Sequence, residues 1–279
     1  MRVPAERHRH ILQLAFSERI VRIRDLARTL NVHEMTVRRD LDVLAEGGLL
    51  ERVHGGARVA QGAGTEVAYR VRAGQHTGAK EQIAKAALTL IEENDVVGFD
   101  ASTTALALAQ LLGNVPVQAV VTGLDVANVL AAAGVPLTLI GGSFHERARS
   151  FVGSLVTQNL SRLRLDTVFF SAKGFSPRTG FTDAHLPEVE VKERLIAVSR
   201  RVVALVDSSK FGYEAFGQIA PIERVDILIT EAAPPPAVVR ALEKAQVRLV
   251  VAGHPAAEHP AAEPAEHIAA KPGENGETR

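Results

Sequence analysis

Seven short apolar runs, separated by segments of helical periodicity, restrict the fold of this chain more than any other feature. Most of the runs are nearly continuous Val, Leu, Ile and Phe, as expected for strands that are covered on both faces. Strands of this kind alternating with helices predict a mainly parallel, Rossmann-like α/β sheet. The expected strands are residues 95–100, 117–122, 137–141, 166–172, 202–207, 226–230 and 247–252. The expected helices between them are residues 80–93, 103–112, 124–132, 153–163, 187–200 and 236–245.

A different pattern occupies the first sixty residues. In a helix over residues 33–44, at about 100° per residue, Val37, Leu41 and Leu44 fall on one face and predict a buried stripe. The outer face then carries the candidate DNA contacts Met35, Thr36, Arg38 and Arg39. Arginine pairs with guanine edges or phosphates, and a small hydroxyl approaches a base without a clash, so this face suits a major groove. The alternative is a plain solvated surface.

The segments on either side favour the DNA-binding interpretation. Residues 5–17 and 24–30 read as helices, and the four residues 31–34 make a tight connection with the spacing of a helix-turn-helix. Residues 49–59 read as strand, glycine turn, strand, which predicts a small hairpin wing. The wing supplies three further candidate DNA contacts: Arg52, His54 and Arg58.

These two motifs, residues 36–41 followed by residues 52–57, together resemble the N-terminal winged helix-turn-helix of the DeoR family of bacterial transcriptional repressors. His33 departs from the family pattern, which usually has a serine there to cap the recognition helix. A weaker cap costs about 1 kcal/mol, which does not alter the expected fold.

Charge and composition narrow the class of protein. Residues 1–60 hold 11 Arg and 8 Asp or Glu, a balance of +3, so the remaining 21 basic and 24 acidic residues carry −3. A basic head is expected where that part alone meets phosphates. The absence of cysteine excludes disulfides, thiolate zinc sites and cysteine nucleophiles. The most apolar window, residues 124–142, is interrupted by polar residues and a turn, so we expect a cytoplasmic protein without a membrane span.

We therefore expect a DNA-binding domain at residues 1–60, a linker at 61–78, an α/β domain at 79–253 and a disordered tail at 254–279. The tail consists mostly of Ala, Pro, Glu, Gly and His and lacks the apolar content to fold. Neither His8 and His10 nor the tail histidines have a ligand spacing, so no metal or cofactor is predicted.

Ligands of open α/β sheets bind beyond the carboxyl ends of the strands. Several of these ends carry more polar residues than turns require, and hydroxyls at a helix start can cradle a phosphate, although ordinary capping explains them equally well. A Glu188–Lys192 pair is usually only a surface bridge. The candidate ligand-binding residues are Asp100, Ser102, Thr103, Thr104, Thr122, Gly141, Gly142, Lys173, Glu188, Lys192, Asp207 and Lys210.

This second region resembles the C-terminal sensor domain of DeoR-type regulators, which is similar in fold to ribose-5-phosphate isomerase. Ala101, Lys173 and Glu231 depart from the family pattern. The resemblance implies a sugar-operon repressor, not an enzyme, that binds an operator in double-stranded DNA as a dimer or tetramer and is released by a phosphorylated sugar. Two alternatives remain: a sugar-phosphate isomerase that carries a DNA-binding head, with Glu188 or Asp207 as base, and an architectural DNA-binding protein whose second region only oligomerises.

Overall fold

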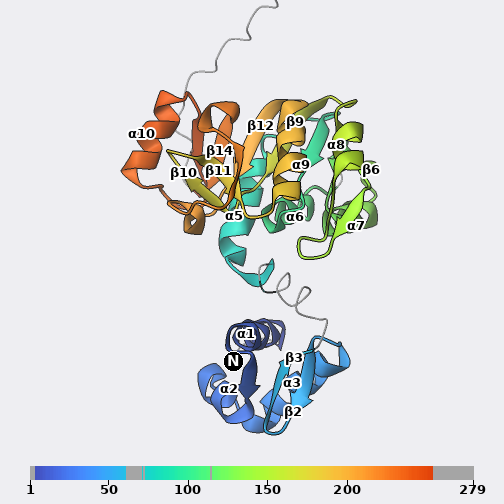
Figure 1. Cartoon of the computed structure of the whole chain (residues 1–279), viewed down its shortest axis with the longest axis vertical. Coiled ribbons are helices and arrows are strands. Elements are labelled where there is room, and N and C mark those ends of the chain that lie inside the picture. The colour runs from blue at the N-terminus through green and yellow to red at the C-terminus, as the bar shows by residue number, and fades with distance from the viewer. Residues whose placement is uncertain (1–3, 61–70, 72, 114, 254–279) are drawn as a thin grey trace, which may run out of the picture.

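The computed structural model describes residues 4–60, 71, 73–113 and 115–253 of the chain. Figure 1 shows two groups of elements, an N-terminal head in blue and a larger body that runs from cyan to orange. The head has its own apolar core, and the body has one core on each face of its main sheet. Most of the predicted linker and the whole predicted tail lie outside the described residues.

The head is a three-helix unit with a small antiparallel sheet. Its elements are α1 (Pro4–Glu18), β1 (Ile20–Arg22), α2 (Ile23–Leu30), α3 (Glu34–Glu46), β2 (Leu50–Val53) and β3 (Gly56–Val59). The sheet order is β1-β3-β2, so the predicted wing exists and gains a third strand that the sequence analysis missed. Three residues are too few for an alternating pattern to be recognised.

The turn before α3 follows from two backbone conformations. Asn31 ends α2 in the left-handed region with φ 52°, which asparagine tolerates better than most residues. His33 is extended, and its Nδ1 accepts a hydrogen bond from the backbone N–H of Met35 at 3.2 Å. Histidine therefore acts as the N-cap of α3, at the position where the family usually has a serine.

The body is built on a seven-stranded parallel sheet of order β15-β14-β12-β9-β4-β5-β6. All seven predicted strands belong to it: β4 (Val96–Phe99), β5 (Gln118–Val121), β6 (Leu137–Leu139), β9 (Leu165–Phe170), β12 (Ser199–Leu205), β14 (Ile227–Thr230) and β15 (Arg248–Val251). The strand order reverses direction between β4 and β9, which makes a topological switch point where crevices form.

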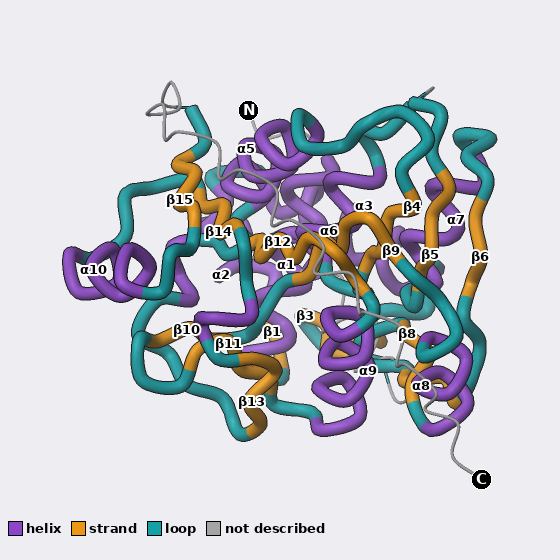
Figure 2. The backbone as a smooth tube through the Cα atoms, turned by 90° about the horizontal axis from the view of Figure 1, so that it is seen from above, coloured by secondary structure: helices purple, strands orange, loops and turns teal. Residues whose placement is uncertain are grey.

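Helices cover both faces of the sheet (Figure 2). One face packs against α5 (Thr77–Leu88), α6 (Thr103–Ala109) and α7 (Leu124–Ala132). The other packs against α8 (Ser154–Leu160), α9 (Leu186–Ala197) and α10 (Pro236–Lys244). This double cover explains why the strands are apolar throughout.

Some predicted boundaries are wrong. The helix expected at 187–200 ends at Ala197, because Ser199 already pairs with Leu165 as part of β12. The helix expected at 80–93 ends at Leu88 but begins at Thr77, inside the predicted linker. Two accessory sheets were not predicted: the hairpin β7 (Ser143–His145) with β8 (Ser150–Val152), and the antiparallel set β10 (Gly174–Ser176), β11 (Gly180–Asp183) and β13 (Gly217–Ala220). Within the described residues, every helix is too short or too polar to cross a membrane.

Candidate functional sites

The outer face of α3 is open to solvent. Val37, Leu41 and Leu44 are buried as predicted. Met35 is 54% exposed and the side chain of Arg38 is 50% exposed, while Arg39 is also exposed. The only ion pair that the structure gives Arg38 among the described residues is a loose one, with Nη2 3.8 Å from a Glu34 oxygen. Exposed cations with loose partners can turn to phosphates or base edges at little cost.

A buried ion pair fixes α3 against α1. Arg7 donates to both carboxylate oxygens of Asp40, at 2.7 and 2.8 Å, and Nε2 of His8 lies 3.0 Å from the same carboxylate. Burial alone would raise the pKa of Asp40, but the hydrogen bonds from Arg7 and His8 outweigh it and hold the pKa below its usual value. No local sequence pattern predicts this pair, because its members lie 33 residues apart.

The wing does not present its predicted residues on one side. Arg58 lies opposite Glu51 across the hairpin and donates to it at 3.1 and 3.2 Å. Arg52 is the next residue along β2, so it points to the other face, and its Nε lies 3.6 Å from Asp42 of α3. His54 is exposed at the turn. Arg52 therefore lies beside the α3 surface, whereas Arg58 does not share its face.

The body contains a cavity of about 400 Å³ at the carboxyl ends of the central strands. Predicted residues that line it are Ser102, Thr103, Thr104, Lys173, Glu188, Lys192, Asp207 and Lys210. They follow β4, β9 and β12 or come from α9, which is where the switch point places a crevice. Five further cations and imidazoles line it as well: His76, Lys80, His145, Arg147 and His185.

The remaining predicted residues do not line this cavity. Asp100 lies directly behind it, accepting backbone N–H groups of Ser102 and Ser171 at 3.0 Å each. Thr122 is buried, and its carbonyl accepts the N–H of Phe151. A Cβ at Gly142 would come within 2.7 Å of Val152 backbone, so this glycine permits close packing. Gly141 is exposed nearby.

Several polar side chains at the cavity serve the backbone. Ser102 caps α6 by accepting from the N–H of Ala105 at 3.1 Å, so the capping alternative holds for this residue. Asp207 caps the short 3-10 helix Ser208–Lys210 by accepting from the N–H of Ser209 at 3.2 Å. Lys210 Nζ lies 3.9 Å from Asp207 and remains part of the lining.

Lys192 forms the charged floor of the cavity. Its Nζ lies 2.8 Å from Asp183, 2.9 Å from the carbonyl of Ser171 and 3.6 Å from Asp100. Burial alone lowers the pKa of Lys192, but the carboxylates of Asp183, Asp100 and Glu188 raise it above its ordinary value, so the ammonium stays charged. The expected surface bridge between Glu188 and Lys192 is absent from the described contacts, because both side chains are buried and Lys192 faces Asp183 instead.

The two carboxylates beside Lys192 respond differently. Burial raises the pKa of Asp183, but Lys192 overcomes it and brings the pKa below its usual value. For Asp100 burial prevails and raises the pKa, although Lys192 and two backbone N–H groups oppose it. Asp183 is therefore the principal counter-ion of Lys192. Sequence analysis missed it because it belongs to β11, an unpredicted strand.

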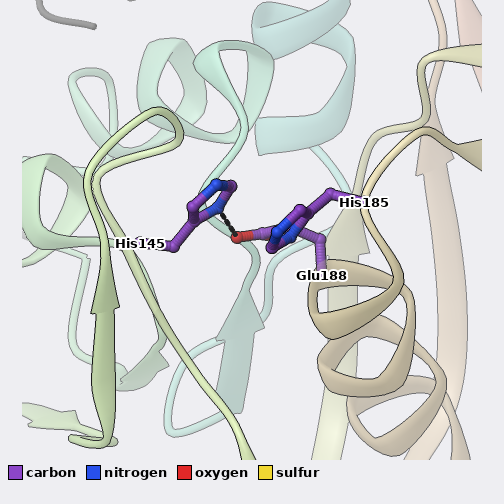
Figure 3. Close-up of side chains that lie close together, drawn as sticks. All are labelled: His145, His185 and Glu188. Atoms are coloured by element: carbon purple, nitrogen blue, oxygen red, sulfur yellow. Dashed lines mark hydrogen bonds and ion pairs between the residues drawn. The ribbon is translucent and has the colours of Figure 1, made fainter.

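Two histidines and Glu188 form a cluster in the cavity wall (Figure 3). His145 Nδ1 lies 3.1 Å from Glu188, and Ser150 donates a hydrogen bond to the same carboxylate oxygen. The rings of His145 and His185 stack with centroids 3.8 Å apart. The two histidines lie forty residues apart in the sequence, and no local spacing points to them.

Both parts of the chain match models of known protein families. Residues 7–62 match the family model described as a DeoR-like helix-turn-helix domain, and residues 75–232 match the DeoR C terminal sensor domain. The transcriptional regulator GolR of Listeria innocua is 34% identical over 82% of this chain and 91% of its own length. The transcriptional repressor GlcR of Bacillus subtilis is 33% identical over 80% of this chain and 86% of its own length.

Among solved structures, ribose 5-phosphate isomerase A of Methanocaldococcus jannaschii superposes with a TM-score of 0.37 at 19% identity, over 47% of this chain and 53% of that one. This similarity is too low to support a conclusion about ligand or activity.

Proposed function

The chain belongs to the DeoR family of transcriptional regulators and is a DNA-binding regulator, and from this premise we propose that it is a repressor released from its operator by a phosphorylated sugar. Three steps are required: α3 reads DNA, the body cavity binds the effector, and binding of the effector changes the position of the head.

The exposed face of α3 supports the first step. Met35, Thr36, Arg38 and Arg39 follow the N-terminus of α3, which is the end of a recognition helix that contacts base edges. Arg52 lies 3.6 Å from Asp42 of the same helix, and in this proposal it contacts a phosphate of the adjoining backbone.

The charge of the cavity supports a phosphorylated ligand. Its lining includes five cations, Lys80, Arg147, Lys173, Lys192 and Lys210, against three carboxylates, Asp183, Glu188 and Asp207, a balance of +2. Such a balance matches a phosphate dianion. The carboxylates and the threonine hydroxyls supply hydrogen-bond partners for sugar hydroxyls. The coexistence of cationic and carboxylate side chains in one cavity is the observation that carries this part of the proposal.

The described residues of the segment before α5, 71 and 73–76, include contacts to both the head and the cavity. Val71 is 7% exposed and packs in the head core. The carbonyl of Gly74 accepts a hydrogen bond from Arg9 of α1 at 3.4 Å, while Gln75 and His76 line the cavity. An effector that prefers one arrangement of Gln75 and His76 would thereby shift the head, since only differential affinity for two states moves their equilibrium.

The test is a DNA mobility shift with the full chain and the promoter region next to its own gene. We expect a salt-sensitive complex that a sugar phosphate dissociates and the unphosphorylated sugar does not. We also propose that the protein acts as a homo-oligomer, a dimer or tetramer, because paired heads bind two half-sites; light scattering measures this. A complex that no member of a sugar-phosphate panel weakens would contradict the effector proposal and leave the DNA-binding assignment intact.

A further inference from the structure

We propose that His145, His185 and Glu188 bind a divalent transition-metal ion of the zinc class in the wall of the body cavity. The site concerns the metal alone and does not depend on which organic effector the cavity takes. It also differs from the sequence-based expectation, in which Glu188 belonged to the effector site and no metal was predicted.

Three separately anchored positions bring the ligands together. His145 ends β7, His185 is the residue before α9, and Glu188 lies in the first turn of α9. One potential ligand atom from each lies within 4.8 Å of the other two (Figure 3). This is the one such group of His, Asp or Glu side chains within the described residues.

The surrounding contacts hold these positions in place. Ser150 of β8 donates to Glu188, which joins the β7–β8 hairpin to α9. On the opposite side of the hairpin, Arg149 donates to both oxygens of Asp125 in α7, at 3.0 and 2.8 Å. The hairpin that carries His145 is thus tied to helices on both faces of the sheet. Supporting hydrogen bonds to a ligating carboxylate, such as that from Ser150, are typical of metal sites.

The donor set selects the class of metal. Two imidazoles and one carboxylate form a set that holds zinc with a fourth position open to water or substrate. Nitrogen-rich sites favour Zn²⁺, Co²⁺ and Ni²⁺ over Mg²⁺ and Ca²⁺, which prefer oxygen donors. Because all three residues line the cavity, an ion there would be accessible to an oxygen of a bound ligand.

A second observation concerns His185. The Nδ1 atom of His185 is buried and has no hydrogen-bond partner. Among the described residues, it is the one buried side-chain nitrogen or oxygen for which this is so. A buried polar atom without a partner is costly and uncommon in native proteins. Coordination of an ion through Nδ1 gives this atom a partner that the described residues do not supply.

The stacked arrangement must change on binding. The rings of His145 and His185 are 8° from parallel, and ring nitrogens direct their lone pairs within the ring plane. Tetrahedral coordination with metal–nitrogen distances near 2.0 Å places ligand atoms about 3.3 Å apart. Rotation of one histidine side chain would bring a nitrogen of each ring to this distance. Both residues are partly exposed and line the cavity, which leaves room for the rotation.

The experiment uses untagged full-length protein, stripped with a chelator and kept above the ordinary imidazole pKa of about 6.5. Calorimetric titration with Zn²⁺ is expected to show one tight site per chain, and Co²⁺ is expected to give visible absorption bands of a four-coordinate nitrogen and oxygen site. His145→Gln and His185→Gln should each weaken Zn²⁺ binding at least 10-fold, since loss of a mere supporting contact costs about 10- to 100-fold. Circular dichroism checks that the variants fold.

The histidines of the C-terminal segment provide the matched control. His254, His259 and His267 could chelate metal without any built site, so replacing all three with Gln should leave the tight site unchanged. The proposal fails if the wild-type protein binds no stoichiometric Zn²⁺, or if the tail variant loses the site while His145→Gln and His185→Gln keep it. Because metal binding is measured without effector, its failure is distinguishable from failure of the proposed function.

Discussion

The head and the body each contain a buried cation paired with a carboxylate. The pair in the head is closed off by protein, whereas the pair in the body is open to a cavity. In the head, Arg7 donates two hydrogen bonds to Asp40 and His8 donates a third, so both carboxylate oxygens have partners and the pair holds α3 against α1. In the body, Lys192 is shared between Asp183 and Asp100 on the floor of a cavity of about 400 Å³. A closed pair fixes geometry, whereas a pair beside a cavity can respond to what enters it.

Removing one member of the closed pair should have the largest effect on stability. Arg7→Met leaves Asp40 buried without its counter-ion, which typically costs about 3–5 kcal/mol. The loss of stability is measured by unfolding the full chain in denaturant, with hydrogen exchange of peptides from the head as the readout. The double variant Arg7→Met with Asp40→Leu should recover most of the loss, because a buried pair replaced by apolar residues is often neutral. Equal losses for the single and double variants would contradict this account.

The open pair should respond to ligand as well as to substitution. We expect Lys192→Met to lower the free energy of unfolding by at most about 3–5 kcal/mol, because Asp183 and Asp100 lose their cation. Unlike the head variant, it should also abolish the thermal stabilisation by sugar phosphate that the proposed function predicts for the wild-type protein. Arg7→Met, tested in parallel, should keep the stabilisation of body peptides. Ligand stabilisation retained by Lys192→Met would show that the floor of the cavity does not contact the effector.

The exposed face of α3, which the Arg7–Asp40 pair holds in place, should affect operator binding and not stability. Arg38→Ala and Arg39→Ala should each weaken operator binding by about 1–3 kcal/mol if they contact bases, with unchanged thermal stability. Arg240→Ala, in the exposed part of α10, is the matched control and should leave binding unchanged. Arg58→Ala should cost less than about 1 kcal/mol, since Arg58 is paired with Glu51 and faces away from Arg52. Equal effects at Arg58 and Arg38 would refute the assigned faces of the wing.

The connection between the two regions should show a smaller, selective effect. Allosteric coupling is typically about 1–3 kcal/mol, and Arg9→Ala removes the contact with Gly74 that the proposed mechanism uses. We expect operator affinity and effector affinity, each measured alone, to change little, while the fold-reduction of DNA affinity by saturating effector decreases. Arg19→Ala, an exposed arginine beyond α1, is the control. An unchanged fold-reduction would exclude Arg9 from the connection.

The smallest expected effect is a difference between head and body in how much stability each loses in acid. The depressed pKa of Asp40 stabilises the head above the carboxyl's unfolded value near 3.9, and this is lost as pH falls through the lower folded pKa. In the body Asp183 behaves likewise, but the raised pKa of Asp100 acts oppositely and favours the folded state as pH falls. Hydrogen exchange between about pH 5 and pH 2 should therefore show the head losing protection more steeply.

The extent of sequence-based prediction differs between these regions for a physical reason. Local periodicity identified the buried face of α3, the wing strands and all seven strands of the main sheet, because each depends on residues close in sequence. It also placed Ser102, Lys173, Glu188 and Lys192 at strand and helix ends that do line one cavity. It could not show that Thr122, Gly141 and Gly142 lie outside that cavity.

The sequence by itself determined the two-part architecture and the exposed, arginine-bearing face of α3, since amphipathic spacing and strand patterns act over a few residues. Tertiary structure decided which polar side chains meet: Asp40 with Arg7, Lys192 with Asp183, and His145 with His185 and Glu188. These partners lie on different elements, and the order of strands in the sheet brings them together. No local pattern encodes that order, because it depends on how the whole chain packs its apolar surfaces.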